Sequence, residues 1–278
     1  SSCMFEDLFP ALIHKIRNPR TKLVVSVYLL PTPPWRGAYG STLVNRYIFW
    51  IMYSLGIYLA RMTASTIWTA SEADAAYIRQ AFDKRAKAIR GGVDLTAASR
   101  AKRKSHFQAL SLGRFHPQKN LFDLLDIWTL VNRRLPGALL VLAGAGFLKK
   151  QLQERINQLG LTRTVEIVSA IDGQEKFNMY ASSDLFVSAS QYDTGNLALD
   201  EALACGTPGV LYETGKMYFP KGVAWVPIRE KQQFADVVVE LLQNNTKRRV
   251  LAQEAVHFAR TLSWDSQAEE ALKSLWQF

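Results

Sequence analysis

Cysteine is scarce in this 278-residue chain, which contains only Cys3 and Cys205, far apart and in unlike contexts. A disulfide framework is therefore not expected, and a reducing, cytoplasmic compartment is expected. The sequence also lacks low-complexity tracts, internal repeats and a secretory-leader pattern at its first residues. Its four histidines form no cluster with metal-ligand spacing, so no metal site is predicted.

Apolar residues, in contrast, make up 48% of the chain, which is enough for two hydrophobic cores. From about residue 104 onward, segments typical of strands alternate with segments typical of helices. The predicted strands cover residues 108–113, 138–143, 165–168, 184–189, 208–212 and 223–226, and the predicted helices cover residues 120–134, 147–159, 173–181, 197–204, 230–243, 247–260 and 265–278. This alternation predicts an α/β fold with a parallel, doubly wound sheet, on which ligands bind beyond the carboxyl ends of the strands.

The first part of the chain follows a shorter pattern. It predicts a helix over residues 6–17 and strands over 22–30, 65–70 and 86–91, which amount to half of a Rossmann-like domain. A three-stranded half sheet would expose an apolar edge that invites pairing. We therefore expect the N-terminal half of this domain to be missing from the chain or to be supplied by another chain.

The most informative segment is QYDTGNLALDEALACG, residues 191–206, in which Asp193 stands eight positions before Glu201. A buried strand precedes it, so the order is strand, polar loop and a helix that starts near Leu197. Such a helix N-terminus presents free backbone N–H groups and the positive end of a dipole, which suits a phosphate. The two carboxylates suit sugar or ribose hydroxyls; alternatively, Asp193 caps the loop and Glu201 is a solvated residue of the first helical turn.

Two cations and two glycines follow neighbouring predicted strands. In LSLGRFHPQKN, residues 110–120, Arg114 can bind phosphate oxygens through two parallel N–H groups and Lys119 is a compact point charge. In VLAGAGFL, residues 141–148, Gly144 and Gly146 indicate either a tight turn or the close approach of a phosphate.

Taken in order, these segments resemble the retaining glycosyltransferases of the GT-B fold, specifically family 4, the glycosyl transferases group 1. Asp193 and Glu201 are similar to the Glu-x7-Glu signature of that family, and Arg114 and Lys119 stand where it has Arg and Lys. The resemblance covers about residues 65–278. It implies two Rossmann-like domains, the first incomplete at its N-terminal side. The division would be 1–103 for the acceptor-binding part, 104–260 for the donor-binding domain and 261–278 for a C-terminal helix that crosses back to the first domain.

The resemblance also implies the reaction, a retaining transfer of a hexose of the mannose or glucose type from a UDP- or GDP-linked sugar to a hydroxyl acceptor. The acceptor would be a saccharide or lipid-linked, with no cofactor and no metal. Arg114 and Lys119 would bind the phosphates, Glu201 the ribose and Asp193 the transferred sugar. The remaining donor-binding positions would be Gly113, Gly144, Gly146, Ser169, Ala170, Ile171, Gly195, Asn196 and Leu197.

Two departures from the family pattern affect the sugar subsite. Asp193 replaces the usual Glu, and Thr194-Gly195-Asn196 replaces Pro-Phe-Gly. The identity of the donor sugar therefore stays open. One alternative is a nucleotide-sugar-binding subunit that is inactive without a partner chain or a missing segment, and another is a sugar-nucleotide epimerase of the same fold.

The net charge is confined to one part of the chain. Residues 1–104 contain 16 Lys/Arg and 6 Asp/Glu, whereas residues 105–278 contain 18 of each. The excess suits an anionic membrane surface or a lipid-phosphate acceptor, or it is a solvated basic face; no nucleic-acid-binding signature accompanies it. The uncharged stretch Tyr47–Ala60 is shorter than the ~20 residues of a membrane span. It predicts either an interfacial helix or a helix buried inside its domain.

Overall fold

The computed structural model describes residues 5–28, 30, 34–36, 43–82, 85–214 and 220–276. The chain forms two compact units, one of residues 1–91, 216–218 and 267–278, the other of residues 92–215 and 219–266. The boundary drawn from the sequence falls later, between residues 103 and 104. Cys3 lies outside the described residues.

The second unit is built on a six-stranded sheet in the order β6-β5-β4-β7-β8-β9. Its strands are β4 (Phe107–Leu112), β5 (Leu140–Ala143), β6 (Val165–Val168), β7 (Ser183–Ser188), β8 (Gly209–Glu213) and β9 (Val223–Pro227). Every neighbouring pair is parallel. All six strands therefore end at one edge of the sheet, called here the carboxyl edge.

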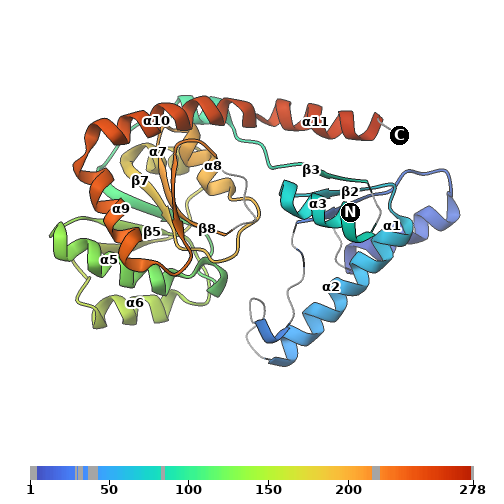
Figure 1. Cartoon of the computed structure of the whole chain (residues 1–278), viewed down its shortest axis with the longest axis horizontal. Coiled ribbons are helices and arrows are strands. Elements are labelled where there is room, and N and C mark those ends of the chain that lie inside the picture. The colour runs from blue at the N-terminus through green and yellow to red at the C-terminus, as the bar shows by residue number, and fades with distance from the viewer. Residues whose placement is uncertain are drawn as a thin grey trace. The chain divides into compact units, whose positions relative to one another are not determined.

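Helices cover both faces of this sheet (Figure 1), with α5, α6 and α9 on one face and α7, α8 and α10 on the other. Their bounds are α5 (Leu121–Arg134), α6 (Lys149–Gln158), α7 (Gly173–Ser182), α8 (Leu197–Ala204), α9 (Lys231–Gln243) and α10 (Asn245–Ala259). The double cover explains why β5 is buried along its whole length. The core includes Trp128, whose indole N–H donates a hydrogen bond to the carbonyl of Ala138 at 3.1 Å.

The first unit has a smaller parallel sheet in the order β1-β2-β3. Its strands are β1 (Val24–Val27), β2 (Thr66–Thr69) and β3 (Ala86–Ala88), and its helices are α1 (Phe5–Arg17), α2 (Leu43–Thr63) and α3 (Glu72–Phe82). The end of α11 (Trp264–Trp276) belongs to this unit. There the indole N–H of Trp68 donates to Ser274 Oγ at 2.9 Å, and Lys87 pairs with Glu270 at 2.7 Å.

Two helices were not predicted, although both have recognisable N-terminal caps. Ser71 Oγ accepts a hydrogen bond from the backbone N–H of Asp74 at the start of α3. Asp94 caps α4 (Leu95–Ser99), since its carboxylate accepts from the N–H of Ala97 at 2.8 Å. Both side chains satisfy unpaired N–H groups of a first helical turn. Ser71 and Asp94 were therefore the residues in the sequence that could have indicated the two helix starts.

Of the two alternatives predicted for residues 47–60, the helix buried inside its domain is wrong. Within α2, only Gly56, Ile57 and Ala60 are buried, and most of the larger apolar side chains are exposed. A helix that packs on one side of a small sheet buries a single stripe, and nothing in the described part of the first unit covers the rest.

Gly222, before β9, is required by close packing in the second unit. Its φ is +85°, and a Cβ there would lie 2.5 Å from the backbone Cα of Ala255 on α10. Gly137 has a similar φ of +86° but open space around it. Gly137→Ala is therefore a matched control, which measures only the cost of placing a residue other than glycine at this positive φ.

We expect Gly222→Ala to lower the free energy of unfolding by about 2 kcal/mol more than Gly137→Ala, because the added methyl forces β9 and α10 apart. Urea denaturation followed by circular dichroism would measure both. Equal losses in the two variants would show that the contact with Ala255 relaxes without cost.

Candidate active site

The turn after β4 presents Lys119 at the carboxyl edge. Residues Pro117–Lys119 form a 3-10 turn that His116 caps, with its Nδ1 accepting from the N–H of Gln118 at 3.3 Å. Asn120 then adopts the left-handed conformation, φ 50°, from which α5 begins. Arg114 is exposed in the same turn, and burial together with its charge lowers the pKa of His116.

This turn contacts the loop after β7. Lys119 Nζ forms an ion pair with Asp193 Oδ2 at 2.7 Å, and Asp193 is only 6% exposed. Gln118 Nε2 donates to the carbonyl of Tyr192 at 2.9 Å, and Ser190 Oγ donates to the carbonyl of Gln118 at 2.9 Å. Because β4 and β7 are adjacent in the sheet, two segments 74 residues apart meet at one place.

The two glycines after β5 allow a third loop to join. A Cβ on Gly144 would lie 1.9 Å from the carbonyl oxygen of Gly113, and one on Gly146 would lie 2.4 Å from that of Phe115. Backbone hydrogen bonds link the same loops, from the N–H of Gly113 to Ala143 and from that of Phe115 to Ala145. Both glycines are therefore explained by the packing of two loops, without a phosphate.

The N-terminus of α8 lies directly after Asp193. Asn196 caps it, with Oδ1 accepting from the N–H of Leu199 at 3.2 Å. The N–H groups of Leu197 and Ala198 have no acceptor within the helix, as is general for a first turn. Gly195 is exposed and carries no side chain that would shield them. Backbone donors and the helix dipole thus favour an anion here.

Glu201, on the next turn of α8, is held by two residues of α7. Lys176 Nζ lies 2.8 Å from Oε1 of Glu201, and the hydroxyl of Tyr180 donates to Oε2 at 2.9 Å. Burial, reinforced by the charge of Glu201, raises the pKa of Tyr180, so that its phenol stays protonated as a donor. Lys176 also lies 3.8 Å from Asp172, in the loop after β6.

Sequence reasoning did not find Lys176 and Tyr180. Their spacing of four residues on the predicted helix 173–181 places them on one helical face, and that was the only local signal. Ser169 and Ala170, predicted to meet the base, lie exposed after β6, and Ile171 is half-buried.

The two predicted carboxylates thus each belong to a charge-compensated pair: Asp193 pairs with the predicted Lys119, and Glu201 pairs with Lys176, which was not predicted. Each carboxylate retains lone pairs that can accept further hydrogen bonds from hydroxyls. The cations and the start of α8 provide positive charge for a polyanion such as a pyrophosphate. The site can therefore bind a molecule that combines phosphate with several hydroxyl groups.

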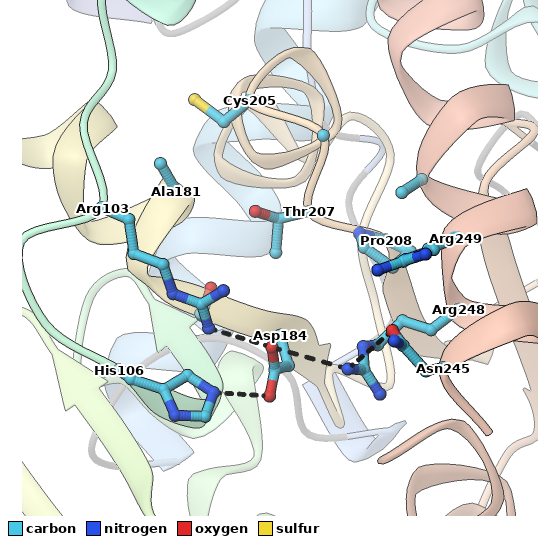
Figure 2. Close-up of a pocket in the computed structure, with 13 residues that line it drawn as sticks. Arg103, His106, Ala181, Asp184, Cys205, Thr207, Pro208, Asn245, Arg248 and Arg249 are labelled. Carbon is cyan, nitrogen blue, oxygen red and sulfur yellow. Dashed lines mark hydrogen bonds and ion pairs between the residues drawn. The ribbon is translucent and has the colours of Figure 1, made fainter. Parts of the chain in front are cut away.

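A separate pocket of about 530 Å³ lies at the opposite, amino edge of the sheet (Figure 2). At its centre, Asp184 contacts Arg103 at 3.1 Å, His106 at 2.8 Å and Arg248 at 3.9 Å. Among the predicted site residues, none lines this pocket. The network ties the segment before β4 to β7 and to the start of α10.

A family model described as glycosyl transferases group 1 matches residues 94–258. Mannosylfructose-phosphate synthase of Agrobacterium fabrum is 26% identical over 176 residues, 59% of this chain and 39% of that protein. A D-inositol 3-phosphate glycosyltransferase of Corynebacterium urealyticum is 27% identical over 45% of this chain and 30% of its own length. The chain thus spans less than half the length of these relatives.

Solved structures show the same fold. Anabaena HepE in complex with UDP-glucose has a TM-score of 0.78 at 19% identity and covers 98% of this chain, which in turn covers 77% of HepE. Staphylococcus aureus TarM, in complex with UDP among other ligands, has a TM-score of 0.76 at 18% identity, covering 95% of this chain and 53% of TarM. The predicted GT-B class, α/β with Rossmann-like parallel sheets, is confirmed.

The pKa of the Cys205 thiol, at the end of α8, depends in part on the charge of Glu201. Burial and the nearby charge of Glu201 raise its pKa to about 12. Since only the thiolate reacts, we expect iodoacetamide at pH 8.5 to alkylate it about a hundredfold more slowly than an unperturbed thiol. The Cys3→Ser variant leaves Cys205 as the only thiol in the sequence, and mass spectrometry measures its rate of alkylation.

In the Cys3→Ser variant, alkylation of Cys205 should become fast in about 8 M urea, which unfolds most domains. The rate in urea is the control for the folded protein. Glu201→Gln should quicken the reaction of the folded protein, because it removes one cause of the raised pKa. Alkylation of the folded protein as fast as in urea would contradict the raised pKa of the Cys205 thiol.

Proposed function

Because the chain belongs to the group 1 glycosyltransferases, we propose that it is a retaining family 4 enzyme of the GT-B fold. It transfers a hexose of the mannose or glucose type from a nucleoside-diphosphate sugar to a hydroxyl acceptor. The observation that carries this proposal is the contact of Lys119 with Asp193, which brings a phosphate-binding cation and a hydroxyl-binding carboxylate together beside the start of α8.

The donor would lie across the carboxyl edge of the second unit. Its pyrophosphate would meet Lys119, Arg114 and the N–H groups that open α8, while its ribose would donate hydrogen bonds to Glu201. The loop Ser169–Ile171 would meet the base. A phosphate that attracts Lys119 would weaken the ion pair with Asp193 and leave that carboxylate free for hydroxyls of the transferred sugar.

Catalysis would come from stabilising the departing diphosphate. As the bond to the anomeric carbon breaks, negative charge grows on the leaving phosphate, and fixed cations and backbone donors lower the barrier without a metal. Retention would follow from attack of the acceptor on the face that the phosphate leaves, with the departing phosphate taking the acceptor proton. The carboxylate of Asp193 is engaged by Lys119, which fits this route better than attack by a carboxylate.

The acceptor is a saccharide or a lipid-linked hydroxyl compound, and the reaction takes place in the cytoplasm or on the cytoplasmic side of a membrane. This part of the proposal is supported by the basic first part of the chain, 16 Lys/Arg against 6 Asp/Glu over residues 1–104. It is also supported by the relative that acts on D-inositol 3-phosphate, a polyhydroxylated anion.

The test is calorimetric titration of the purified protein with UDP and GDP, followed by turnover assays with UDP-glucose and GDP-mannose. Product formation with the donor's anomeric configuration, read by NMR, supports the proposal. Tight nucleotide binding without turnover favours a binding subunit instead. Release of an epimerised sugar without any acceptor favours an epimerase, and inversion at the anomeric carbon contradicts a retaining mechanism.

Lys119→Met should weaken binding of the nucleoside diphosphate by about tenfold or more, and binding of the nucleoside only slightly, because the lost charge faces the phosphates. Calorimetry with UDP and with uridine measures both affinities. Lys150→Met, which removes an exposed lysine on α6, is the matched control and should leave both unchanged.

The single variant also leaves Asp193 buried without its cation, so the double variant Lys119→Met/Asp193→Asn is needed. It restores local neutrality and should still bind UDP weakly. Recovery of normal UDP affinity in the double variant, or equal losses for UDP and uridine, would show that Lys119 only compensates Asp193.

Transfer activity should be unaffected by a chelator, to within about twofold, because the chain itself supplies the positive charge around the leaving group. The measurement compares initial rates with and without excess EDTA at saturating donor. Loss of activity that added Mg²⁺ or Mn²⁺ restores would contradict a metal-free mechanism.

A further inference from the structure

The outer side of α2 is apolar along almost its full length. Its exposed residues recur at the three- and four-residue spacing of one helical face. They include Val44 at 66% exposed, Ile51 at 53% and Met62 at 65%. The exposed apolar stripe consists of Val44, Tyr47, Ile48, Ile51, Met52, Leu55, Tyr58 and Met62.

The opposite side of the same helix is also apolar. Gly56, Ile57 and Ala60 are buried in the core of the first unit, so the helix is apolar on both sides. A surface helix of a water-soluble unit normally carries polar residues on its outer side. A contiguous apolar face of this kind marks an interaction surface.

The helix has the length and hydropathy of a membrane span, but its packing argues for a different orientation. One side of α2 lies against α1 and the sheet core, and Arg46 and Arg61 bound its uncharged stretch. A helix held along one side by its own unit offers only its outer side to lipid. It therefore suits the plane of the interface rather than a crossing of the bilayer.

Other aromatic and apolar side chains of the first unit are exposed as well. Trp35, 68% exposed, lies beside the start of α2, with its ring 6.4 Å from that of Trp50. Trp and Tyr are the residues that favour the headgroup region of a bilayer. On α1, Phe9, Ile13 and Ile16 are exposed at the same helical spacing.

The surrounding charge identifies the kind of partner. From residue 8 to residue 71 the sequence contains no Asp or Glu, while it contains seven Lys/Arg at positions 15, 17, 20, 22, 36, 46 and 61. A one-signed basic region of this kind is attracted to anionic lipid headgroups. A second copy of the chain would bring the same positive charge against it, which disfavours self-association through this face.

We propose that the exposed stripe of α2 docks the first unit on an anionic phospholipid bilayer, with its apolar side chains at the boundary between headgroups and acyl chains. The basic residues of α1, α2 and the segment between them attract the surface, and the stripe supplies the insertion. This surface deepens the proposed function, since it would bring the protein to lipid-linked acceptors. Its test, however, does not depend on transferase activity.

The experiment is flotation of the purified protein with phosphatidylcholine vesicles that contain or lack phosphatidylglycerol. The double variant Ile51→Glu/Leu55→Glu places two negative charges on the stripe, at positions already exposed to solvent. We expect its membrane partition coefficient to fall by about a hundredfold, because the loss of each inserted apolar side chain lowers that coefficient by about tenfold. Val250→Glu, an equally exposed apolar position on α10, is the matched control and should float like the unmodified protein.

Circular dichroism and UDP affinity of the double variant check that the protein is intact, because the nucleotide site lies wholly in the second unit. Unchanged flotation of the double variant, or flotation that does not depend on phosphatidylglycerol, would overturn the proposal. The proposal would also be overturned if the unmodified protein bound no vesicles but formed a dimer by analytical ultracentrifugation, and the double variant were a monomer. Failure of the unmodified protein to bind UDP, with intact flotation, would instead count against the proposed transferase.

Discussion

The ion pair between Lys119 and Asp193 is the contact on which the candidate site depends. It neutralises a carboxylate that is almost fully buried, and it holds the turn after β4 against the loop after β7. Without a cation, Asp193 would carry an uncompensated charge in a region of low dielectric. The same contact fixes the distance between the cation and the carboxylate to which the proposed function gives the phosphate and the sugar hydroxyls.

The rest of the carboxyl edge is organised around this pair. Gly144 and Gly146 let the loop after β5 lie directly against residues 113–115, which supports the turn that carries Lys119. On the other side, α7 positions Glu201 through Lys176 and Tyr180. Both acidic residues are thus oriented before any ligand arrives, which reduces the reorganisation needed to bind one.

The two units divide the chemistry of the chain between them. The second has a six-stranded sheet covered by helices on both faces, and it carries the candidate site at the carboxyl edge of that sheet. The first has a basic sequence and a helix that is apolar on its outer side. Such a unit is suited to a charged, apolar surface rather than to water alone, and a membrane that carries anionic lipid has both properties.

Sequence alone determined the alternation of strands and helices, the position of Arg114, Lys119 and Asp193 after strand ends and of Glu201 in the helix that follows, and the confinement of positive charge to the first part. These follow from periodicity and spacing, which are local properties of a chain. The tertiary structure decided that Lys119 meets Asp193, that Lys176 and Tyr180 hold Glu201, and that the outer side of α2 is left uncovered. Those outcomes depend on which distant segments pack together. The sequence of an apolar helix does not indicate whether its outer side faces a core, a membrane or water.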